Sequence, residues 1–271
     1  MEICYSILDP TGNITALVES PVERAQYQTA AAVIMRLHPE VEQVGFLLPI
    51  GMDGLPALQM AGGEFCGNAT MCAAALLRLR GLSGDRVSLH VSGAAQPLEV
   101  CLHQTGDGAF SAELQMPQAR EITEREFAFE NLRGTLPLVC MEGISHIVIE
   151  SGSAFFKLLD NRPQAEQAVR SFCAKLGADG LGLLFLEGEE SERRMTPLVY
   201  IPGSGTVFWE NSCASGSAAA GMYLAYAGSV SGEFNMLQPG GILTITSDAH
   251  TGETRLRGSV RRLLQGESIP I

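Results

Sequence analysis

The amino-acid sequence predicts an α+β fold built from two similar halves. Short runs in which apolar and polar residues alternate, typical of half-buried strands, recur along the 271 residues between a few longer helical patterns. The predicted elements follow the same order in both halves, and each half contains a cysteine at the start of a helix rich in small residues. This repetition is typical of a diverged internal duplication that gives two pseudo-symmetric domains.

The first half begins with strands and a helix. Residues 1–18 form two predicted strands joined by a tight turn at Pro10-Thr11-Gly12-Asn13. A capping box that starts at Ser20, with proline at the first helical position, predicts a helix that extends to about Leu37. A second helix is expected after Cys66, over residues 69–80, and further strands at 88–92, 98–103 and 110–116.

The second half repeats this order. Strands are expected at 136–141 and 146–151, before a helix over 163–176 that ends at Gly177. Strands at 183–186 and 198–201 precede a helix over 213–227 that begins at Cys213 and is stopped by Gly228. The last expected strands are 242–246 and 254–263.

The composition favours a compact globular protein. The chain has 46% hydrophobic residues, and its 30 acidic and 18 basic residues give a formal net charge of -12. An acidic protein repels phosphate backbones and anionic lipid surfaces, so we expect neither a nucleic-acid partner nor a membrane partner. The first residues contain no basic stretch followed by an apolar run, and we expect a cytoplasmic location.

The cysteines and histidines do not form a metal-binding pattern. The seven cysteines include no Cys-x-x-Cys pair, and no two of the five histidines are four residues apart. We therefore expect reduced thiols and no metal.

Cys66 and Cys213 carry the predicted chemistry. The unpaired N–H groups at a helix N-terminus favour a thiolate, so we expect the pKa of both thiols to be drawn toward neutrality. Two equivalent thiols suit the inversion of a stereocentre, in which one group removes a proton from one face and another delivers a proton to the opposite face. The amides at Gly67-Asn68 and Gly216-Ser217 are placed to stabilise a substrate carboxylate.

Other residues have structural interpretations that the local sequence leaves open. Asn13 has the pattern of a turn former, His146 that of a residue at a strand end, and Glu42 and Gln43 that of solvated residues before an apolar run. Glu210 and Trp209 would then only cap and pack the approach to the second cysteine. The remaining cysteines are expected to be core residues; they are Cys4, Cys72, Cys101, Cys140 and Cys173.

The chain resembles the diaminopimelate epimerase superfamily, whose racemases work without pyridoxal phosphate, at Glu64-Phe65-Cys66-Gly67-Asn68-Ala69-Thr70 and Glu210-Asn211-Ser212-Cys213-Ala214-Ser215-Gly216-Ser217. It is more similar to the histidine racemases of staphylopine-type, nicotianamine-like metallophore biosynthesis. The segments that carry this nearer resemblance are Glu42-Gln43-Val44-Gly45-Phe46, the Cys66 segment, Gln115-Met116-Pro117-Gln118-Ala119, Tyr200-Ile201-Pro202, Trp209 to Cys213, and Gln238-Pro239-Gly240-Gly241.

The resemblance implies two domains, each a mixed β-sheet or barrel wrapped around a central helix, with an active site in the cleft between them. The domains would be residues 1–117, with Cys66, and 118–258, with Cys213, while 259–271 would return to the first domain as a final strand. The two thiols would be the opposed bases, and no cofactor would be needed. The implied substrate-binding residues are Asn13, Glu42, Gly67, Asn68, Glu210, Gly216 and Ser217. The resemblance also favours a homodimer.

Departures from the superfamily pattern narrow the substrate. Diaminopimelate epimerases hold the distal end of their substrate with a Glu-Arg pair, where this chain has Gly203-Ser204-Gly205-Thr206. We therefore expect an amino acid with one α-amino-acid head, best matched by histidine, with Glu42 accepting the imidazole N–H. Interconversion of L- and D-histidine would supply D-histidine for an opine metallophore. The alternatives are a diaminopimelate epimerase, a proline-type racemase, or a non-catalytic amino-acid-binding or thiol-sensing protein.

Overall fold

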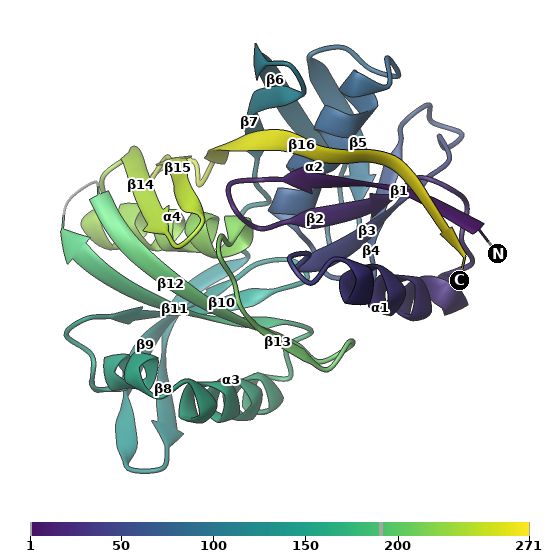
Figure 1. Cartoon of the computed structure of the whole chain (residues 1–271). Helices are drawn as coiled ribbons and strands as arrows, with labels where there is room; N and C mark the ends of the chain where they lie inside the picture. Colours follow the sequence, from purple (N-terminus) through teal and green to yellow (C-terminus); the bar gives the residue numbers. More distant parts are fainter. Residues whose placement is uncertain (1, 190–191, 271) are drawn as a thin grey trace. The chain divides into compact units, whose positions relative to one another are not determined.

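The computed structural model describes residues 2–189 and 192–270, and the chain forms two compact units. The first unit comprises Met1–Gln115 and Arg257–Ile271, and the second comprises Met116–Leu256. Each unit combines strands with helices, as the order of elements along the chain in Figure 1 shows, which confirms the α+β prediction.

The strands of the first unit close into a barrel. They are β1 (Glu2–Asp9), β2 (Thr15–Val18), β3 (Gln43–Leu48), β4 (Ala57–Met60), β5 (Arg86–Val91), β6 (Leu98–Gly106), β7 (Ala109–Gln115) and β16 (Thr254–Pro270). These strands are bonded in that order, and the last of them returns to pair antiparallel with β1. Closure leaves no free edge that would pair with another chain.

Helix α2 (Gly67–Leu79) fills this barrel. It contacts β2, β3, β5, β6 and β7, and every residue from Gly67 to Leu77 is buried. An interior helix needs small side chains because strands approach it from all sides, which explains the Ala-rich pattern of the segment. The prediction of a barrel wrapped around a central helix is therefore confirmed for this unit.

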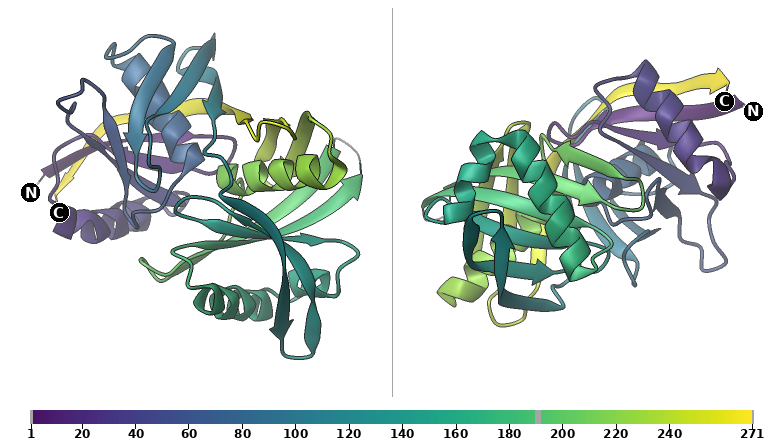
Figure 2. Two further views of the ribbon diagram at one scale, coloured as in Figure 1. Left: turned by 180° about the vertical axis from the view of Figure 1, so that it is seen from behind. Right: turned by 90° about the horizontal axis from the view of Figure 1, so that it is seen from below.

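Helix α1 (Tyr27–Leu37) lies on the outside of the same barrel, as Figure 2 shows from two further sides. Tyr27 at its start stacks on Phe46 of β3, with ring centroids 3.8 Å apart. The predicted start of this helix at Ser20 is wrong. The Ser20 hydroxyl accepts the backbone N–H of Cys4 at 2.9 Å, so it is held by β1, and a 3₁₀ turn (Arg24–Gln26) precedes α1.

The second unit is built on a mixed sheet. Its elements are β8 (Glu121–Phe129), β9 (Leu132–Cys140), β10 (Ser145–Glu150), a 3₁₀ helix (Ala154–Asp160), α3 (Arg162–Leu176), β11 (Leu181–Glu189), β12 (Glu192–Ile201), β13 (Thr206–Trp209), α4 (Ala214–Gly228), β14 (Gly232–Gln238) and β15 (Gly241–Ser247). The order across the sheet is β15-β14-β12-β11-β10-β9-β8, with β13 paired to β12 and the first residues of β16 beside β15.

Helices α3 and α4 cover opposite faces of this sheet. Leu183 and Phe185 of β11 pack in one apolar cluster with Phe172 of α3, while the intervening Leu184 reaches Gly216 of α4. Successive side chains of a strand point to opposite faces, so the two helices lie on different sides. A Cβ added at Gly221 of α4 would be 2.4 Å from Ile245, which again explains the small residues of the buried helix.

The ends of these helices test the predicted caps. Asn161 caps α3, and Gly177 ends it in the left-handed conformation with φ 62°, which confirms the expected stop. Gly228 remains helical, and the left-handed residue after α4 is Ser229 with φ 50°. The predicted stop at Gly228 is therefore displaced by one residue.

Gly93, in the turn between β5 and β6, holds the chain that leads to Cys66. Its φ is +73°, and an added Cβ would lie 2.4 Å from the backbone nitrogen of Phe65. We expect Gly93→Ala to destabilise the protein by about 3–5 kcal/mol through backbone strain and steric overlap. The matched control is Gly81→Ala, with φ +70° and open space around it, for which about 1–2 kcal/mol is expected. Equal losses in urea unfolding would contradict the steric argument.

Candidate active site

Cys66 and Cys213 occupy equivalent positions at the starts of the two buried helices. Cys66 is the N-cap of α2, and its Sγ accepts the backbone N–H of Ala69 at 3.3 Å. Cys213 is the N-cap of α4, and its Sγ accepts the backbone N–H of Gly216 at 3.3 Å. The repeated pattern of a cysteine opening a helix is therefore confirmed in geometry as well as in sequence.

A second hydrogen bond repeats in both caps. The Thr70 hydroxyl donates to the carbonyl oxygen of Cys66, and the Ser217 hydroxyl donates to that of Cys213, each at 2.7 Å. These bonds fix each cysteine backbone against the first turn of its helix. The position of each cysteine is consequently set by the helix that follows it and not by a flexible loop.

A chain of polar side chains surrounds Cys66. Its thiol donates to Oε1 of Gln43 at 2.9 Å. The amide nitrogen of Gln43 donates to the Thr15 hydroxyl at 3.0 Å and to Oδ1 of Asn13. Nδ2 of Asn13 in turn donates to the Glu42 carboxylate at 2.6 Å.

Strand pairing creates this cluster. Strands β2 and β3 are parallel, with Thr15 opposite Gln43, so the turn before β2 and the start of β3 lie together. The predicted residues Asn13, Glu42 and Cys66 are thus brought to one place, and Gly67 and Asn68 follow as the buried first residues of α2. Gln43 was left open by the sequence, although it belongs to the quoted Glu42-Gln43-Val44 segment.

Glu210 and buried polar residues surround Cys213. The backbone N–H of Cys213 donates to Oε1 of Gln238 at 2.8 Å, and Nε2 of Gln238 donates to the Ser217 hydroxyl at 2.9 Å. The Ser215 hydroxyl lies 3.6 Å from the Cys213 sulfur. Gln238 was not among the predicted site residues, and its only sequence signal was the Gln238-Pro239-Gly240-Gly241 segment.

The pKa of the Cys213 thiol is raised well above its ordinary value. Burial is the main cause, and the nearby Glu210 carboxylate adds to it by repelling a thiolate and by accepting a hydrogen bond from the protonated thiol. Ser215 and the Gly216 amide act in the opposite direction but do not outweigh burial. The expectation that the helix N-terminus draws this pKa toward neutrality is therefore wrong for Cys213, because desolvation dominates.

His146 lies behind Cys213 as a neutral, buried imidazole. Its Nε2 is 3.1 Å from the Ser215 hydroxyl, and burial lowers its pKa to about 3. Its Nδ1 has no hydrogen-bond partner within the described residues and would lie 2.3 Å from a Cβ at Gly182. An unpaired lone pair costs less than an unpaired N–H, so we infer that Nε2 carries the proton and donates to Ser215.

The predicted site residues therefore form one group in each unit. Asn13, Glu42, Cys66, Gly67 and Asn68 belong to the first unit. Glu210, Cys213, Gly216 and Ser217 belong to the second.

The structure also defines the contacts of Ser217 and Trp209. The Ser217 hydroxyl is already engaged by Cys213 and Gln238. Trp209 packs as one sequence interpretation expected, since it stacks on Phe185 and its ring N–H donates to Glu166 at 3.0 Å.

No three His, Cys, Asp or Glu side chains between residues 2–189 and 192–270 are grouped as metal ligands would be. Within the same ranges, no helix has the length and apolar character needed to cross a membrane.

The neutral state of His146 makes stability depend on pH. The folded protein leaves this ring unprotonated down to about pH 3, whereas the unfolded chain protonates it below about 6.5. The unfolded state therefore binds more protons between these values, and stability falls as the pH falls, by up to ~1.4 kcal/mol per pH unit. We expect His146→Phe to reduce this slope in urea unfolding followed by the fluorescence of Trp209, the only tryptophan.

The matched control for this measurement is His250→Asn, an exposed histidine of the same unit. Its slope between pH 6.5 and 4.5 should equal that of the unmodified protein. A His146→Phe slope that also stays unchanged would show that folding does not lower the pKa of His146.

Comparison with known proteins identifies the family. The family model described as "Histidine racemase CntK N-terminal domain" matches residues 2–267. A histidine racemase of Staphylococcus aureus is 29% identical over 272 residues, 97% of this chain and 96% of that protein, and one of Fusobacterium nucleatum is 28% identical over 230 residues, 80% of this chain and 78% of that protein.

Solved structures share the fold. A hydroxyproline epimerase of Agrobacterium vitis has a TM-score of 0.67 at 16% identity and covers 99% of this chain and 92% of its own. A PhzF-family phenazine biosynthesis protein of Bacillus anthracis has a TM-score of 0.66 at 14% identity and covers 100% of both chains. The fold is therefore one of epimerases and racemases, and with the match over residues 2–267 the chain belongs to the histidine racemase CntK N-terminal domain family.

Proposed function

We propose that this protein is a cofactor-independent amino-acid racemase in which Cys66 and Cys213 are the two acid/base groups. The observation that carries the proposal is the duplicated cap, in which each thiol accepts an N–H from the first turn of a buried helix. Membership of a histidine racemase family supports the same reaction class.

In the proposed reaction one cysteine thiolate removes the α-proton of the amino acid, and the thiol of the other cysteine donates a proton to the opposite face. The first cysteine ends as a thiol and the second as a thiolate, so the protons balance and the reverse reaction exchanges the roles. The negative charge that develops beside the substrate carboxylate would be stabilised by the N-terminal amides of α2 and α4, around Gly67 and Gly216.

The raised pKa of Cys213 fits a proton donor. A buried thiol beside Glu210 holds its proton at neutral pH until a positive charge enters the site. The ammonium group of an amino-acid substrate would bring such a charge and lower the pKa of the thiol. Substrate binding would thereby bring the acid closer to the acidity that proton transfer requires.

We propose histidine as the substrate, with Glu42 as the acceptor of its imidazole N–H. Glu42 is held by Asn13 in the cluster that contains Cys66, which supports a role close to the reacting carbon. The turn at residues 203–205 joins β12 to β13, and the segment next to Cys213 is Glu210-Asn211, so neither position supplies a guanidinium for a distal carboxylate. This disfavours diaminopimelate as the substrate.

The remaining details stay predictions. They are a supply of D-histidine for an opine metallophore, a homodimer, a cytoplasmic location, and substrate contacts by Asn68 and Ser217. A proline-type racemase is the main enzymatic alternative, and it would share both thiols. A binding or thiol-sensing protein would bind an amino acid without exchanging its α-proton.

Exchange of the α-proton tests the mechanism. In D₂O we expect L-histidine to lose its α-proton signal in proton NMR and to yield D-histidine, while L-proline and diaminopimelate stay unchanged. Cys66→Ser and Cys213→Ser should each lower racemisation by at least about 10²-fold, because a hydroxyl is a far weaker acid than a thiol. The matched control is Cys101→Ser, a thiol on β6 outside both caps, which should keep full activity.

Racemisation that persists in both serine variants would exclude the two-thiol mechanism. Exchange of proline but not of histidine would leave the mechanism standing and replace the substrate. Absence of exchange with every amino acid would favour the non-catalytic alternative.

Glu42→Gln tests the side-chain pocket. Loss of the carboxylate charge should raise the KM for histidine by about tenfold, the effect of a charge-assisted hydrogen bond, with a smaller change in kcat. Glu40→Gln, an exposed acidic neighbour, is the control and should leave both constants unchanged. An unchanged KM in Glu42→Gln would dismiss the proposed imidazole contact.

A further inference from the structure

The hairpin of β14 and β15 holds the segment that leads into α4. The turn of this hairpin is Pro239-Gly240, and the backbone N–H of Gly240 donates to the carbonyl oxygen of Asn211 at 2.8 Å. Gln238, the last residue of β14, reaches the same segment with its buried side chain and contacts Cys213. The hairpin therefore holds the segment at two points, one of which is the cysteine itself.

Gln238 closes a ring of hydrogen bonds around the peptide groups of Cys213. Its Oε1 accepts the backbone N–H of Cys213 at 2.8 Å, and its Nε2 donates to the Ser217 hydroxyl at 2.9 Å. That hydroxyl donates to the carbonyl oxygen of Cys213 at 2.7 Å. One amide side chain thus holds the cysteine from both sides, directly at its N–H and through Ser217 at its carbonyl.

The ring can close in one direction only. A backbone N–H only donates, so the Gln238 atom that faces Cys213 must be the oxygen, and the amide nitrogen must face Ser217. The Ser217 oxygen accepts from that nitrogen and has a single hydrogen, which bonds to the carbonyl oxygen of Cys213. Reversing the amide would bring two donors together and leave a buried N–H unpaired, which is unfavourable.

The ring fixes the direction of the thiol. The backbone of Cys213 is extended, with φ -120° and ψ 106°, and both of its bonded peptide groups resist a change in these angles. The Cα–Cβ bond follows the backbone, and Sγ then lies 3.3 Å from the Gly216 nitrogen. A shift of this backbone would move the sulfur with it, and a displacement of about 1 Å can lower the rate of a reaction by about 10²-fold.

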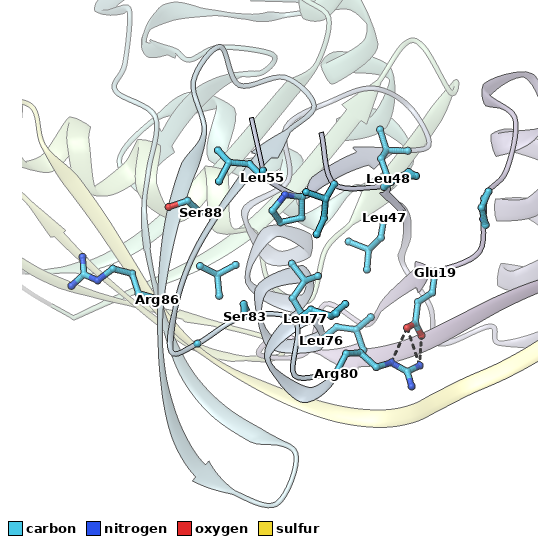
Figure 3. A pocket seen from close by; sticks show the side chains of 18 residues that line it. Glu19, Leu47, Leu48, Leu55, Leu76, Leu77, Arg80, Ser83, Arg86 and Ser88 are labelled. Carbon is cyan, nitrogen blue, oxygen red and sulfur yellow. Dashed lines mark hydrogen bonds and ion pairs between the residues drawn. The ribbon is translucent and has the colours of Figure 1, made fainter. Parts of the chain in front are cut away.

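The far end of α4 offers less support than the far end of α2. Arg80, directly after the last residue of α2, makes two hydrogen bonds to Glu19, and Figure 3 shows this pair at one end of an apolar cavity. The last residues of α4, Tyr226-Ala227-Gly228, include no charged side chain and are exposed. The position of α4 and of the cysteine that caps it therefore depends more on the hydrogen bonds at its start.

We propose that Gln238 is a positioning residue for the acid/base reaction of Cys213. In this role it does not touch the substrate. It acts through the backbone of the cysteine and keeps the thiol in the orientation that proton transfer to or from an α-carbon requires. The role rests on the proposed racemase function, since Gln238 would serve the same reaction.

Gln238→Leu removes both hydrogen bonds of the side chain and keeps much of its volume. We expect kcat for histidine racemisation to fall by about 10²-fold while KM changes less than about twofold, because Gln238 positions a reacting group and does not bind the substrate. The matched control is Thr244→Val, which removes the hydrogen bond from Thr244 to Asn235 in the same hairpin. It should leave both constants unchanged.

Gln238→Glu separates positioning from a loss of stability. A protonated carboxyl can rebuild the ring, because its carbonyl oxygen accepts from Cys213 and its O–H donates to Ser217, whereas a carboxylate cannot donate. Burial raises the pKa of such a carboxyl, so it ionises only above about pH 5. Relative to the unmodified protein at each pH, kcat should be close to normal below this pH and fall at least tenfold above it.

Gln238→Leu should instead have a low relative kcat at every pH, because leucine cannot rebuild the ring. Circular dichroism at each pH should show that both variants remain folded. In ¹H–¹⁵N NMR, the amide proton of Cys213 should move upfield in Gln238→Leu, since it loses its acceptor, and should stay in place in Thr244→Val. This last readout needs no turnover.

An unshifted Cys213 amide in Gln238→Leu would overturn the proposed role whatever the activity. A kcat of Gln238→Leu equal to that of Thr244→Val would also overturn it and leave the two-thiol mechanism intact. A loss of kcat in Gln238→Glu that is the same at every pH would assign Gln238 a merely structural role. Absence of racemisation in the unmodified protein would reject the proposed function, and the role of Gln238 with it.

Discussion

Each unit buries most of one helix, including its start, and the first turn of that helix must be satisfied from within the unit. The first N–H groups of a helix lack partners in the helix itself, and in a buried helix they cannot bond to bulk water. Both units meet this constraint with a cysteine sulfur, which accepts an amide of the first turn in α2 and in α4. The acceptor that each helix start requires is therefore supplied here by a thiol.

Burial affects the pKa of the Cys213 thiol more than the helix N-terminus does. A helix N-terminus lowers a cysteine pKa only when the amides outweigh the loss of hydration. At Cys213 they do not, because the sulfur is nearly inaccessible and a carboxylate lies beside it. The same desolvation keeps His146 neutral behind Ser215. The protonation state of the Cys213 thiol therefore depends on the charge of any molecule that binds beside it.

The sequence predicted the features that depend on local chemistry. Both Cys-led helices, the Asn13 turn between two strands and the stop of α3 at Gly177 follow from periodicity and capping, which a single segment contains. The start of α1 was predicted too early because the Ser20 hydroxyl bonds to Cys4 of β1 and does not cap the helix. Gln43 and Gln238 were missed as site residues because their partners lie far away in the chain, and only tertiary structure brings them together.

Strand β16 constrains the order in which the two units can fold during synthesis. The first unit closes its barrel only when residues 261–270 pair with β1, yet these residues are made after the whole second unit. During synthesis, more than half of the chain is therefore made before the partner strand of β1 exists. Until then one edge of β1 has unpaired N–H and C=O groups. Because domains fold as units while synthesis proceeds, the second unit has the opportunity to fold first. Pairing of β16 with β1 closes the sheet and removes a free edge that could otherwise pair with another chain.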